Sequence, residues 1–299
     1  MTSPTIKAVL IDLSGTLHVG DQPIPGAREA LQRLRQSGRR IRFLTNTSAK
    51  STTQLLEQLN GPNLQFDISR DDLTTSVLAT ATYVKRHKLK PLCLMEDVSD
   101  MPTDVQDIQP KNDALRATTV PSTTSFDSVV VGLAPTQFHY AQLNMAFRIL
   151  LQHSNNLIAI HRANYVRDSS SSSELSLGPG AFVAALETSS GCDTAKVMGK
   201  PSREFFSSAL WDDVPVEETC MIGDDILADI QGARAVGIGT TILVQTGKYL
   251  PGDESKITSL ASHEEEEEDQ SKMSGSMSAV FRVCPSIVEA VDFILSTYC

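Results

Sequence analysis

The chain has 299 residues, 40% of them apolar and 21% charged, which is typical of a globular protein long enough for one large domain or two smaller ones. Six of its ten net negative charges lie in the acidic run 264–269, and the rest of the chain has no basic stripe, which argues against nucleic acid as a partner. No stretch approaches the roughly 20 apolar residues of a membrane-spanning helix, which argues against a membrane as a partner.

The first predicted element is an apolar run that ends at Asp12. Residues 7–11 lead directly to Asp12, and the turn-forming pair Ser14 and Gly15 follows. Such a run is typical of a buried strand, and in open α/β sheets ligands gather beyond the carboxyl ends of the strands, where Asp12 would lie. Alternatively, Asp12 accepts backbone N–H bonds within the turn.

Helices and strands then alternate along the chain. The pattern predicts a helix within residues 25–38, a strand over 40–45 and a helix over 51–59. This alternation builds a parallel sheet with right-handed crossovers. Thr45 and Asn46 would therefore lie at the same edge as the first carboxylate, where they could hold phosphate oxygens or cap a helix.

A second α/β unit begins at about residue 75. We expect three strands and three helices there: strands 91–95, 126–132 and 157–160, and helices 77–87, 137–151 and 181–189. In the helix over 137–151, the side chains expected to face inward are Leu143, Phe147, Leu150 and Leu151.

Two later strand ends carry charged residues. Lys200 follows a short strand and precedes a helix, although it could also be a solvated lysine. A further apolar strand ends at Gly223, and Asp224, Asp225 and Asp229 follow. Acidic residues at a helix start also suit the helix dipole, so part of this pattern needs no functional explanation.

The elements together predict an α/β fold. We expect a Rossmann-like parallel-sheet core domain, residues 1–74 and 195–299, with an inserted α/β cap domain, residues 75–194. The polar and low-complexity stretches predict flexible insertions at 96–125, 168–174 and 257–278.

The predicted strand ends offer groups suited to phosphate chemistry. The Asp12 carboxylate could attack phosphorus to form an acyl-phosphate, but two anions repel each other unless a cation lies between them. Mg²⁺ prefers oxygen ligands and often binds through one or two carboxylates, for which Asp12 and Asp224 form the natural pair. Lys200 would neutralise further charge, and the Thr45 hydroxyl would orient the phosphate oxygens.

The order of these motifs resembles the haloacid dehalogenase superfamily of phosphohydrolases. The motifs are Asp-x-x-Gly-Thr at 12–16, a Thr after the second strand, Gly-Lys-Pro at 199–201 and Gly-Asp-Asp-x-x-x-Asp at 223–229. The inserted unit resembles the large cap of the class related to the nucleotide phosphatase NagD, and segments 132–140 and 244–249 extend the similarity over nearly the whole chain. The resemblance implies a small phosphorylated substrate or phosphoamino acid and a homodimer formed through the cap.

One departure from the family pattern concerns Ser14. Most phosphatases of the superfamily carry a second Asp at this position, whose backbone carbonyl binds Mg²⁺ and whose carboxyl protonates the leaving group. The resemblance implies that the Ser14 carbonyl still binds the metal, while the general acid, which typically contributes roughly 10²–10⁴-fold, is missing. Pyrophosphate and P–N bonded substrates of the phosphohistidine or phospholysine type have better leaving groups and fit this departure.

Several further residues have open roles. His18 could restore a proton donor at neutral pH, or could simply pack within its loop. Asp229 and Asp225 are expected to support the metal ligands, with helix capping as the alternative for Asp225. In the cap, His161 and Tyr165 could face the substrate or only pack in the core.

We therefore predict a Mg²⁺-dependent phosphohydrolase that acts through a phosphorylated Asp12 on pyrophosphate, a P–N bonded compound or a small phosphorylated metabolite. The alternatives are a catalytically weak metal- and phosphate-binding scaffold or regulator, and phosphoryl transfer to an acceptor other than water. Five scattered cysteines indicate free thiols in a reducing compartment, and the early first strand leaves no room for a signal peptide. We expect a cytoplasmic protein, with the nucleus as a further location.

Overall fold

The protein consists of two compact units. The computed structural model describes residues 5–110, 125–153, 156–167, 175–256 and 279–298. The core unit comprises residues 1–45, 58–74 and 201–299, and the cap unit comprises residues 46–57 and 75–200. Across the described segments, no helix combines the length and the apolar character needed to cross a bilayer.

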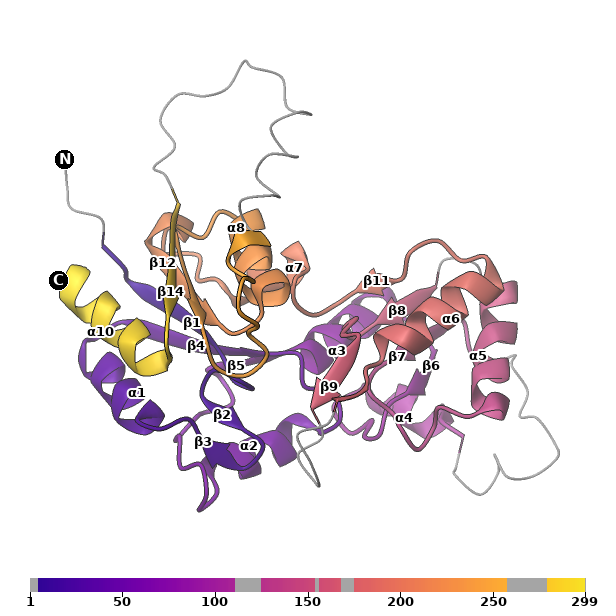
Figure 1. Ribbon diagram of the computed structural model, residues 1–299. Helices are drawn as coiled ribbons and strands as arrows, with labels where there is room; N and C mark the ends of the chain where they lie inside the picture. The colour runs from indigo at the N-terminus through magenta and orange to yellow at the C-terminus, as the bar shows by residue number, and fades with distance from the viewer. Residues whose placement is uncertain (1–4, 111–124, 154–155, 168–174, 257–278, 299) are drawn as a thin grey trace, which may run out of the picture. The chain divides into compact units, whose positions relative to one another are not determined.

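A six-stranded sheet forms the centre of the core unit (Figure 1). The strands are β1 Ala8–Asp12, β4 Arg40–Thr45, β5 Leu73–Thr75, β12 Thr219–Gly223, β13 Thr240–Val244 and β14 Val280–Cys284. Their order in the sheet is β14-β13-β12-β1-β4-β5. Every residue of β1, β12 and β13 is buried, as expected for strands that are covered on both faces.

β1 lies in the middle of this sheet and has a parallel strand on either side. Asp12 is opposite Leu44 of β4, and Ile11 is opposite Ile222 of β12. Because these strands run parallel, their carboxyl ends meet at one edge of the sheet. Asp12, Thr45 and the end of β12 therefore share that edge.

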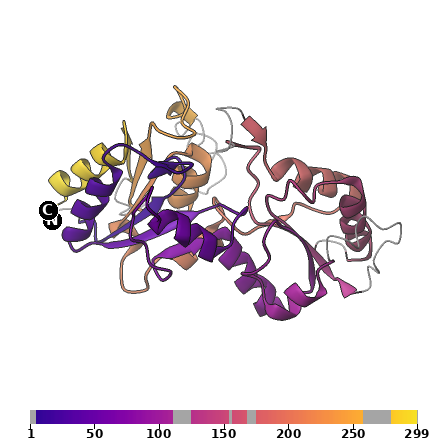
Figure 2. The ribbon, with the colours of Figure 1, turned by 90° about the horizontal axis from the view of Figure 1, so that it is seen from below.

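Helices cover the faces of the core sheet (Figure 1, Figure 2). They are α1 Ala27–Gln36, α7 Arg203–Ala209, α8 Gly232–Ala235, α10 Ile287–Thr297, the 3₁₀ turn η2 Val216–Glu218 and the π-helix η3 Ile226–Gln231. α1 packs beside α10, and α7 packs beside α8. α1 buries one stripe, Ala27, Ala30, Leu31 and Leu34, which is the spacing of an amphipathic helix. Ser286 begins α10 by accepting the N–H of Val288.

A short hairpin follows β1 directly. Its strands are β2 His18–Val19 and β3 Gln22–Pro23, which pair in antiparallel register. The Gln58 side chain donates to Asp21 Oδ1 at 2.6 Å and so ties the hairpin to α2, Thr52–Asn60. Strands of two residues carry no detectable hydrophobic alternation, so the sequence did not predict this hairpin.

A four-stranded parallel sheet forms the centre of the cap unit. Its elements are β6 Pro91–Leu94, β7 Ser128–Val131, β8 Leu157–Ala159, β11 Lys196–Val197, α3 Ser76–His87, α4 Thr103–Ile108, α5 Tyr140–Gln152 and α6 Gly180–Ser190, with the antiparallel pair β9 Tyr165–Arg167 and β10 Leu175–Leu177. The strand order is β11-β8-β7-β6. Side chains alternate across the sheet, so Val129 and Val131 pack with α5 and α6, whereas Val130 packs with α3 and α4.

Two local expectations in the cap are wrong. Residues 96–125 were predicted to be an irregular insertion, but α4 lies within them and buries Val105. A single buried apolar side chain gives too short a pattern to indicate a helix. In α5 the inward stripe includes Met145 and Ile149, which turns Leu151 outward with 58% of its surface exposed.

The unit borders can be compared with the predicted domain borders. The main segment of the cap unit begins after residue 74 and ends at residue 200. The cap domain was predicted over residues 75–194. Residues 46–57 also group with the cap unit, so α2, Thr52–Asn60, begins in one unit and ends in the other. The predicted insertions at 168–174 and 257–278, and residues 111–124 of the first insertion, lie outside the described residues.

Truncation of Leu10 in the centre of β1 should destabilise the core unit. Leu10 is fully buried, so Leu10→Ala leaves a cavity that we expect to lower the free energy of unfolding by about 3 kcal/mol. Val280→Ala in the edge strand, where Val280 is 38% exposed, should cost less than about 1 kcal/mol. The chain has a single tryptophan, Trp211, within the core unit, so its fluorescence during denaturant titration reports on this unit. An equal decrease in the free energy of unfolding in the two variants would contradict the packing of β1.

Candidate active site

Three buried aspartates meet at the carboxyl edge of the core sheet. Asp12 ends β1, Asp224 follows β12, and Asp229 lies in η3. Each offers a carboxylate oxygen, and these oxygens all lie within 4.8 Å of one another. The three residues are only 5%, 2% and 1% exposed, respectively. The structure thus brings together the two predicted metal ligands and one residue that was predicted to support them.

Two glycines and a backbone N–H hold the Asp224 carboxylate. A Cβ placed on Gly15 would lie 1.9 Å from Asp224 Oδ2, and one placed on Gly247 would lie 2.0 Å from the same oxygen. The Lys248 N–H donates to this oxygen at 2.7 Å. Thr246 Oγ1 donates to the Gly15 carbonyl at 2.5 Å, which joins the turn after β13 to the turn after β1. One oxygen of Asp224 is therefore fixed by backbone that admits no side chain.

The electrostatics of this cluster favour a bound cation. Burial raises the pKa of Asp224 well above its usual value, and the charges of Asp12 and Asp229 raise it further, against a smaller opposing effect of Lys248. Close, buried carboxylates are hard oxygen ligands that repel one another, which is the donor set that Mg²⁺ prefers. The residues present therefore fit a divalent cation held by Asp12 and Asp224, with Asp229 beside them.

Asp225 begins the π-helix η3. Its Oδ1 accepts the N–H groups of Leu227 and Ala228 at 3.1 and 2.9 Å, and its own N–H donates to Asp229 Oδ2 at 3.1 Å. A Cβ on Gly223 would lie 2.4 Å from the Cβ of Asp229, so the chain needs glycine there. Asp225 therefore acts as a helix cap and at the same time orients the Asp229 carboxylate. Single-turn π-helices are frequent at functional sites.

The predicted phosphate-binding residues fall into two groups. Thr45 ends β4 at the core edge and is 1% exposed. Asn46 and Lys200 contact each other: Asn46 Nδ2 donates to the Lys200 carbonyl, and the Lys200 N–H donates to Asn46 Oδ1, both at 2.9 Å. A Cβ on Gly199 would lie 2.3 Å from Asn46 Oδ1, so this pairing also depends on glycine.

Ser14 and His18 lie in the segment after Asp12. Ser14 is exposed, whereas the His18 ring is buried and lies 6.3 Å from the ring of Phe66. His18 Nδ1 lies 2.7 Å from the Gly20 carbonyl, and because a carbonyl only accepts, Nδ1 carries a proton and donates it there. His18 could give up a proton from Nε2 only when its ring is charged.

The two cap residues singled out from the sequence differ in setting. His161 is buried at the end of β8, where Nδ1 accepts the Ala163 N–H at 3.3 Å and Nε2 lies 3.0 Å from Ser48 Oγ. Because Nδ1 accepts, Nε2 carries the proton and donates to Ser48, whose oxygen also accepts the Leu133 N–H at 3.0 Å. These bonds fix the His161 ring within the cap, whereas Tyr165 is 38% exposed.

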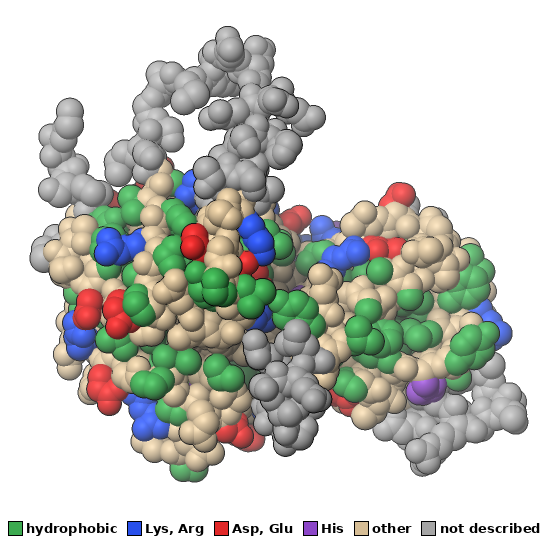
Figure 3. All heavy atoms as spheres, viewed as in Figure 1, with side chains coloured by type: hydrophobic (Ala, Val, Ile, Leu, Met, Phe, Trp, Pro, Cys, Tyr) green, Lys and Arg blue, Asp and Glu red, His purple; other side chains and the backbone are tan. Residues whose placement is uncertain are grey.

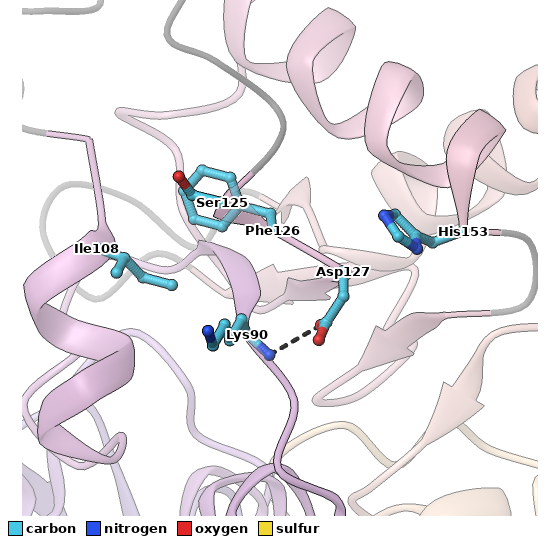
Figure 4. A pocket seen from close by; sticks show the side chains of 6 residues that line it. All are labelled: Lys90, Ile108, Ser125, Phe126, Asp127 and His153. Carbon is cyan, nitrogen blue, oxygen red and sulfur yellow. Dashed lines mark hydrogen bonds between the residues drawn. The ribbon is translucent and has the colours of Figure 1, made fainter.

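A hollow in the cap unit offers no comparable chemistry (Figure 4). It has a volume of about 390 Å³ and is lined by Lys90, Ile108, Ser125, Phe126, Asp127 and His153. It lies at the amino ends of β6 and β7, opposite to the edge where ligands of open α/β sheets gather. The Asp127 carboxylate accepts the Lys90 N–H at 2.8 Å and so is engaged locally. Acidic and basic side chains are interspersed on the face drawn in Figure 3.

Comparisons with known proteins identify the family. Residues 9–102 match a family described as haloacid dehalogenase-like hydrolase, and residues 197–266 match a second profile of the same hydrolase type. Haloacid dehalogenase-like hydrolase domain-containing protein 2 of Bos taurus is 42% identical over 296 residues, covering 98% of this chain and 98% of that protein. The chain belongs to the haloacid dehalogenase-like hydrolases. Phospholysine phosphohistidine inorganic pyrophosphate phosphatase of Mus musculus is 36% identical over 255 residues, covering 83% of this chain and 86% of that relative.

Solved structures share the fold. NagD from E. coli K-12 superimposes with a TM-score of 0.69 at 23% identity, over 95% of this chain and 98% of that chain. A glycerol phosphate phosphatase from Mycobacterium tuberculosis, in complex with magnesium, has a TM-score of 0.64 at 27% identity, over 82% of this chain and 69% of that chain. These structures confirm the predicted α/β fold with its cap, and the family match and the relatives confirm the predicted superfamily and the enzymatic nature of the protein.

Sequence reasoning gave no role to the turn after β13. Residues 244–249 contributed only to the resemblance, yet Gly247 and Lys248 contact the Asp224 carboxylate directly. A signal was present, because a Gly-Lys pair follows a buried parallel strand and so lies at the same sheet edge as the acids.

A methyl group on Gly247 should disrupt the acidic cluster. Gly247 has φ +61°, and its added Cβ would also lie 2.4 Å from the Cα of Gly15, so Gly247→Ala should lower the free energy of unfolding by about 2–4 kcal/mol. The matched control is Gly38→Ala, which has φ +75° but nothing within 4 Å of the new Cβ, and should cost about 1 kcal/mol. Trp211 fluorescence in denaturant measures both. A Gly247→Ala variant as stable as the control would refute the close contact.

Proposed function

We propose that this chain is a Mg²⁺-dependent phosphohydrolase that acts through a phosphorylated Asp12. The observation that carries the proposal is the cluster of Asp12, Asp224 and Asp229 at the carboxyl edge of the core sheet. Family membership supports hydrolysis, and the magnesium complex of the related glycerol phosphate phosphatase supports the choice of ion. The substrate is a small molecule or an amino-acid side chain that carries a phosphoryl group.

In the proposed reaction, an Asp12 carboxylate oxygen attacks phosphorus. The new bond joins this oxygen to phosphorus while the bond to the leaving group breaks, and the leaving group takes the electron pair. Water then attacks the same phosphorus, releases inorganic phosphate and regenerates the Asp12 carboxylate. Bound to Asp12, Asp224 and the Ser14 carbonyl, Mg²⁺ would offset the negative charge of the carboxylates and of the phosphoryl oxygens.

The remaining predicted residues would act on the phosphoryl oxygens. The Thr45 hydroxyl can donate to one of them, and the Lys200 ammonium can neutralise charge that builds up as the bond to the leaving group breaks. The two hydrogen bonds between Asn46 and Lys200 hold these two predicted residues together within the cap unit. Asp225 and Asp229 would orient the metal ligands.

The choice of leaving group is proposed to follow from Ser14. A serine hydroxyl is too weak an acid to protonate an alkoxide leaving group at neutral pH, so simple alkyl phosphates should react slowly. Phosphate and imidazole leave more readily. One relative is named for phospholysine, phosphohistidine and inorganic pyrophosphate, and we propose substrates of this type for the present chain.

The substitution Asp12→Asn should abolish turnover and preserve the fold. The amide side chain has nearly the same size as the carboxylate but carries no nucleophilic charge, so we expect kcat to fall by at least roughly 10³-fold. The matched control is Asp213→Asn, which removes an exposed carboxylate paired with Arg40 and should retain activity. The assay offers Mg²⁺ with pyrophosphate, imidodiphosphate and a simple alkyl phosphate. Turnover that persists in Asp12→Asn would refute the mechanism, and no turnover by the unmodified protein would favour a metal-binding scaffold.

The substitution Ser14→Asp should widen the substrate range. Ser14 is exposed, so an aspartate fits there, and it would supply the proton that an alkoxide needs. We expect the ratio of alkyl phosphate to pyrophosphate turnover to rise by roughly 10- to 100-fold, within the usual range of general acid catalysis. Ser14→Asn matches the size but has no acidic proton and should leave the ratio unchanged. A similar ratio in both variants would show that position 14 does not limit the chemistry.

A further inference from the structure

The ammonium of Lys248 lies beside Asp225, the residue between the acidic cluster's Asp224 and the π-helix that carries Asp229. Its Nζ is 3.5 Å from Asp225 Oδ2, and its side chain is 37% exposed. Burial tends to lower the pKa of Lys248, but the charges of Asp225, Asp224, Asp12 and Asp229 outweigh that effect and raise it. Lys248 is therefore positively charged at neutral pH and is attracted by all four carboxylates.

The position of Lys248 is set by backbone contacts. The turn after β13 is joined to Gly15 through Thr246, and the Lys248 N–H is bonded to Asp224 Oδ2. These contacts involve no atom of the lysine side chain. The ammonium can therefore move outward into solvent while the turn continues to hold the Asp224 carboxylate.

We propose that Lys248 is a positioning residue with two separate roles in the candidate metal site. Its backbone N–H fixes one oxygen of Asp224 whether or not a cation is bound, and its ammonium is the internal counter-cation that stabilises the acidic cluster when no metal is present. This inference rests on the proposed Mg²⁺ site.

The two cations have the same sign and compete for the same carboxylates. Without Mg²⁺, the ammonium offsets the repulsion among Asp12, Asp224 and Asp229. With Mg²⁺ bound, that repulsion is already offset, and the ammonium is repelled. Lys248 thus makes the metal-free protein more stable at the expense of Mg²⁺ affinity, which we expect to be roughly 3- to 30-fold weaker than it would be without this charge.

The test compares Lys248→Met with Lys248→Arg. The Met variant loses the charge and keeps the backbone N–H, whereas the Arg variant keeps both. The control Lys7→Met removes a lysine that pairs with Glu218 at 2.7 Å, near the opposite end of β1. Each protein is titrated with Mg²⁺ by calorimetry, and its thermal unfolding is followed by Trp211 fluorescence in EDTA and in saturating Mg²⁺.

In Lys248→Met, the melting temperature in EDTA should fall by several degrees, the loss should largely disappear in Mg²⁺, and the Kd for Mg²⁺ should decrease roughly 3- to 30-fold. Lys248→Arg and Lys7→Met should keep the unmodified Kd within about 2-fold. Should the Met variant fail to fold, Lys248→Gln provides the same comparison.

Two results would overturn the inference while leaving the metal site intact. One is an equal loss of stability in EDTA and in Mg²⁺, which would indicate a purely structural lysine. The other is an unchanged or increased Kd in Lys248→Met. If the unmodified protein shows neither Mg²⁺ binding nor stabilisation by Mg²⁺, the proposed metal site itself is wrong, and the inference fails with it.

Discussion

Repulsion among three buried carboxylates is the constraint on which the candidate site depends. Asp12, Asp224 and Asp229 are taken out of water and held within 4.8 Å of one another, an arrangement that is unfavourable unless positive charge is nearby. The sheet imposes it, because β1 and β12 are adjacent parallel strands that end together. The free energy gained by forming the sheet thus exceeds the free energy needed to bury the carboxylates close together. Burial, together with this repulsion, raises the pKa of Asp224, and the repulsion would be relieved by a bound cation.

Glycines let the backbone approach these charges closely. Gly15 and Gly247 lie against one oxygen of Asp224, Gly223 lies against Asp229, and Gly199 lies against Asn46. Any side chain at these four positions would displace a functional group. The acidic cluster of the core unit is therefore built as much from the absence of side chains as from the carboxylates themselves, and its geometry is largely set before a ligand arrives.

Much of this arrangement could be predicted from the sequence, because it depends on strong local patterns. The apolar runs before Asp12 and Asp224 predicted buried strands, and parallel strands must end at one edge. The Gly-Lys pair after β13 indicates the right edge of the sheet, but it does not indicate the contact of Lys248 with Asp224, because that contact depends on a turn whose geometry is set by a glycine at φ +61°. The helix α4 was missed because it buries only Val105. Leu151 was assigned to the wrong side because it follows a true inward residue, Leu150.

The paired hydrogen bonds between Asn46 and Lys200 join residues that are 154 positions apart in the chain. Asn46 and Lys200 are the first and last residues of the cap unit, so the first entry of the chain into this unit and its last exit lie side by side, although residues 58–74 return to the core unit in between. The interior of the cap unit can lengthen, shorten or be replaced in evolution while the junction stays the same. The cap unit can thus diversify without any change to the residues that would carry out the chemistry.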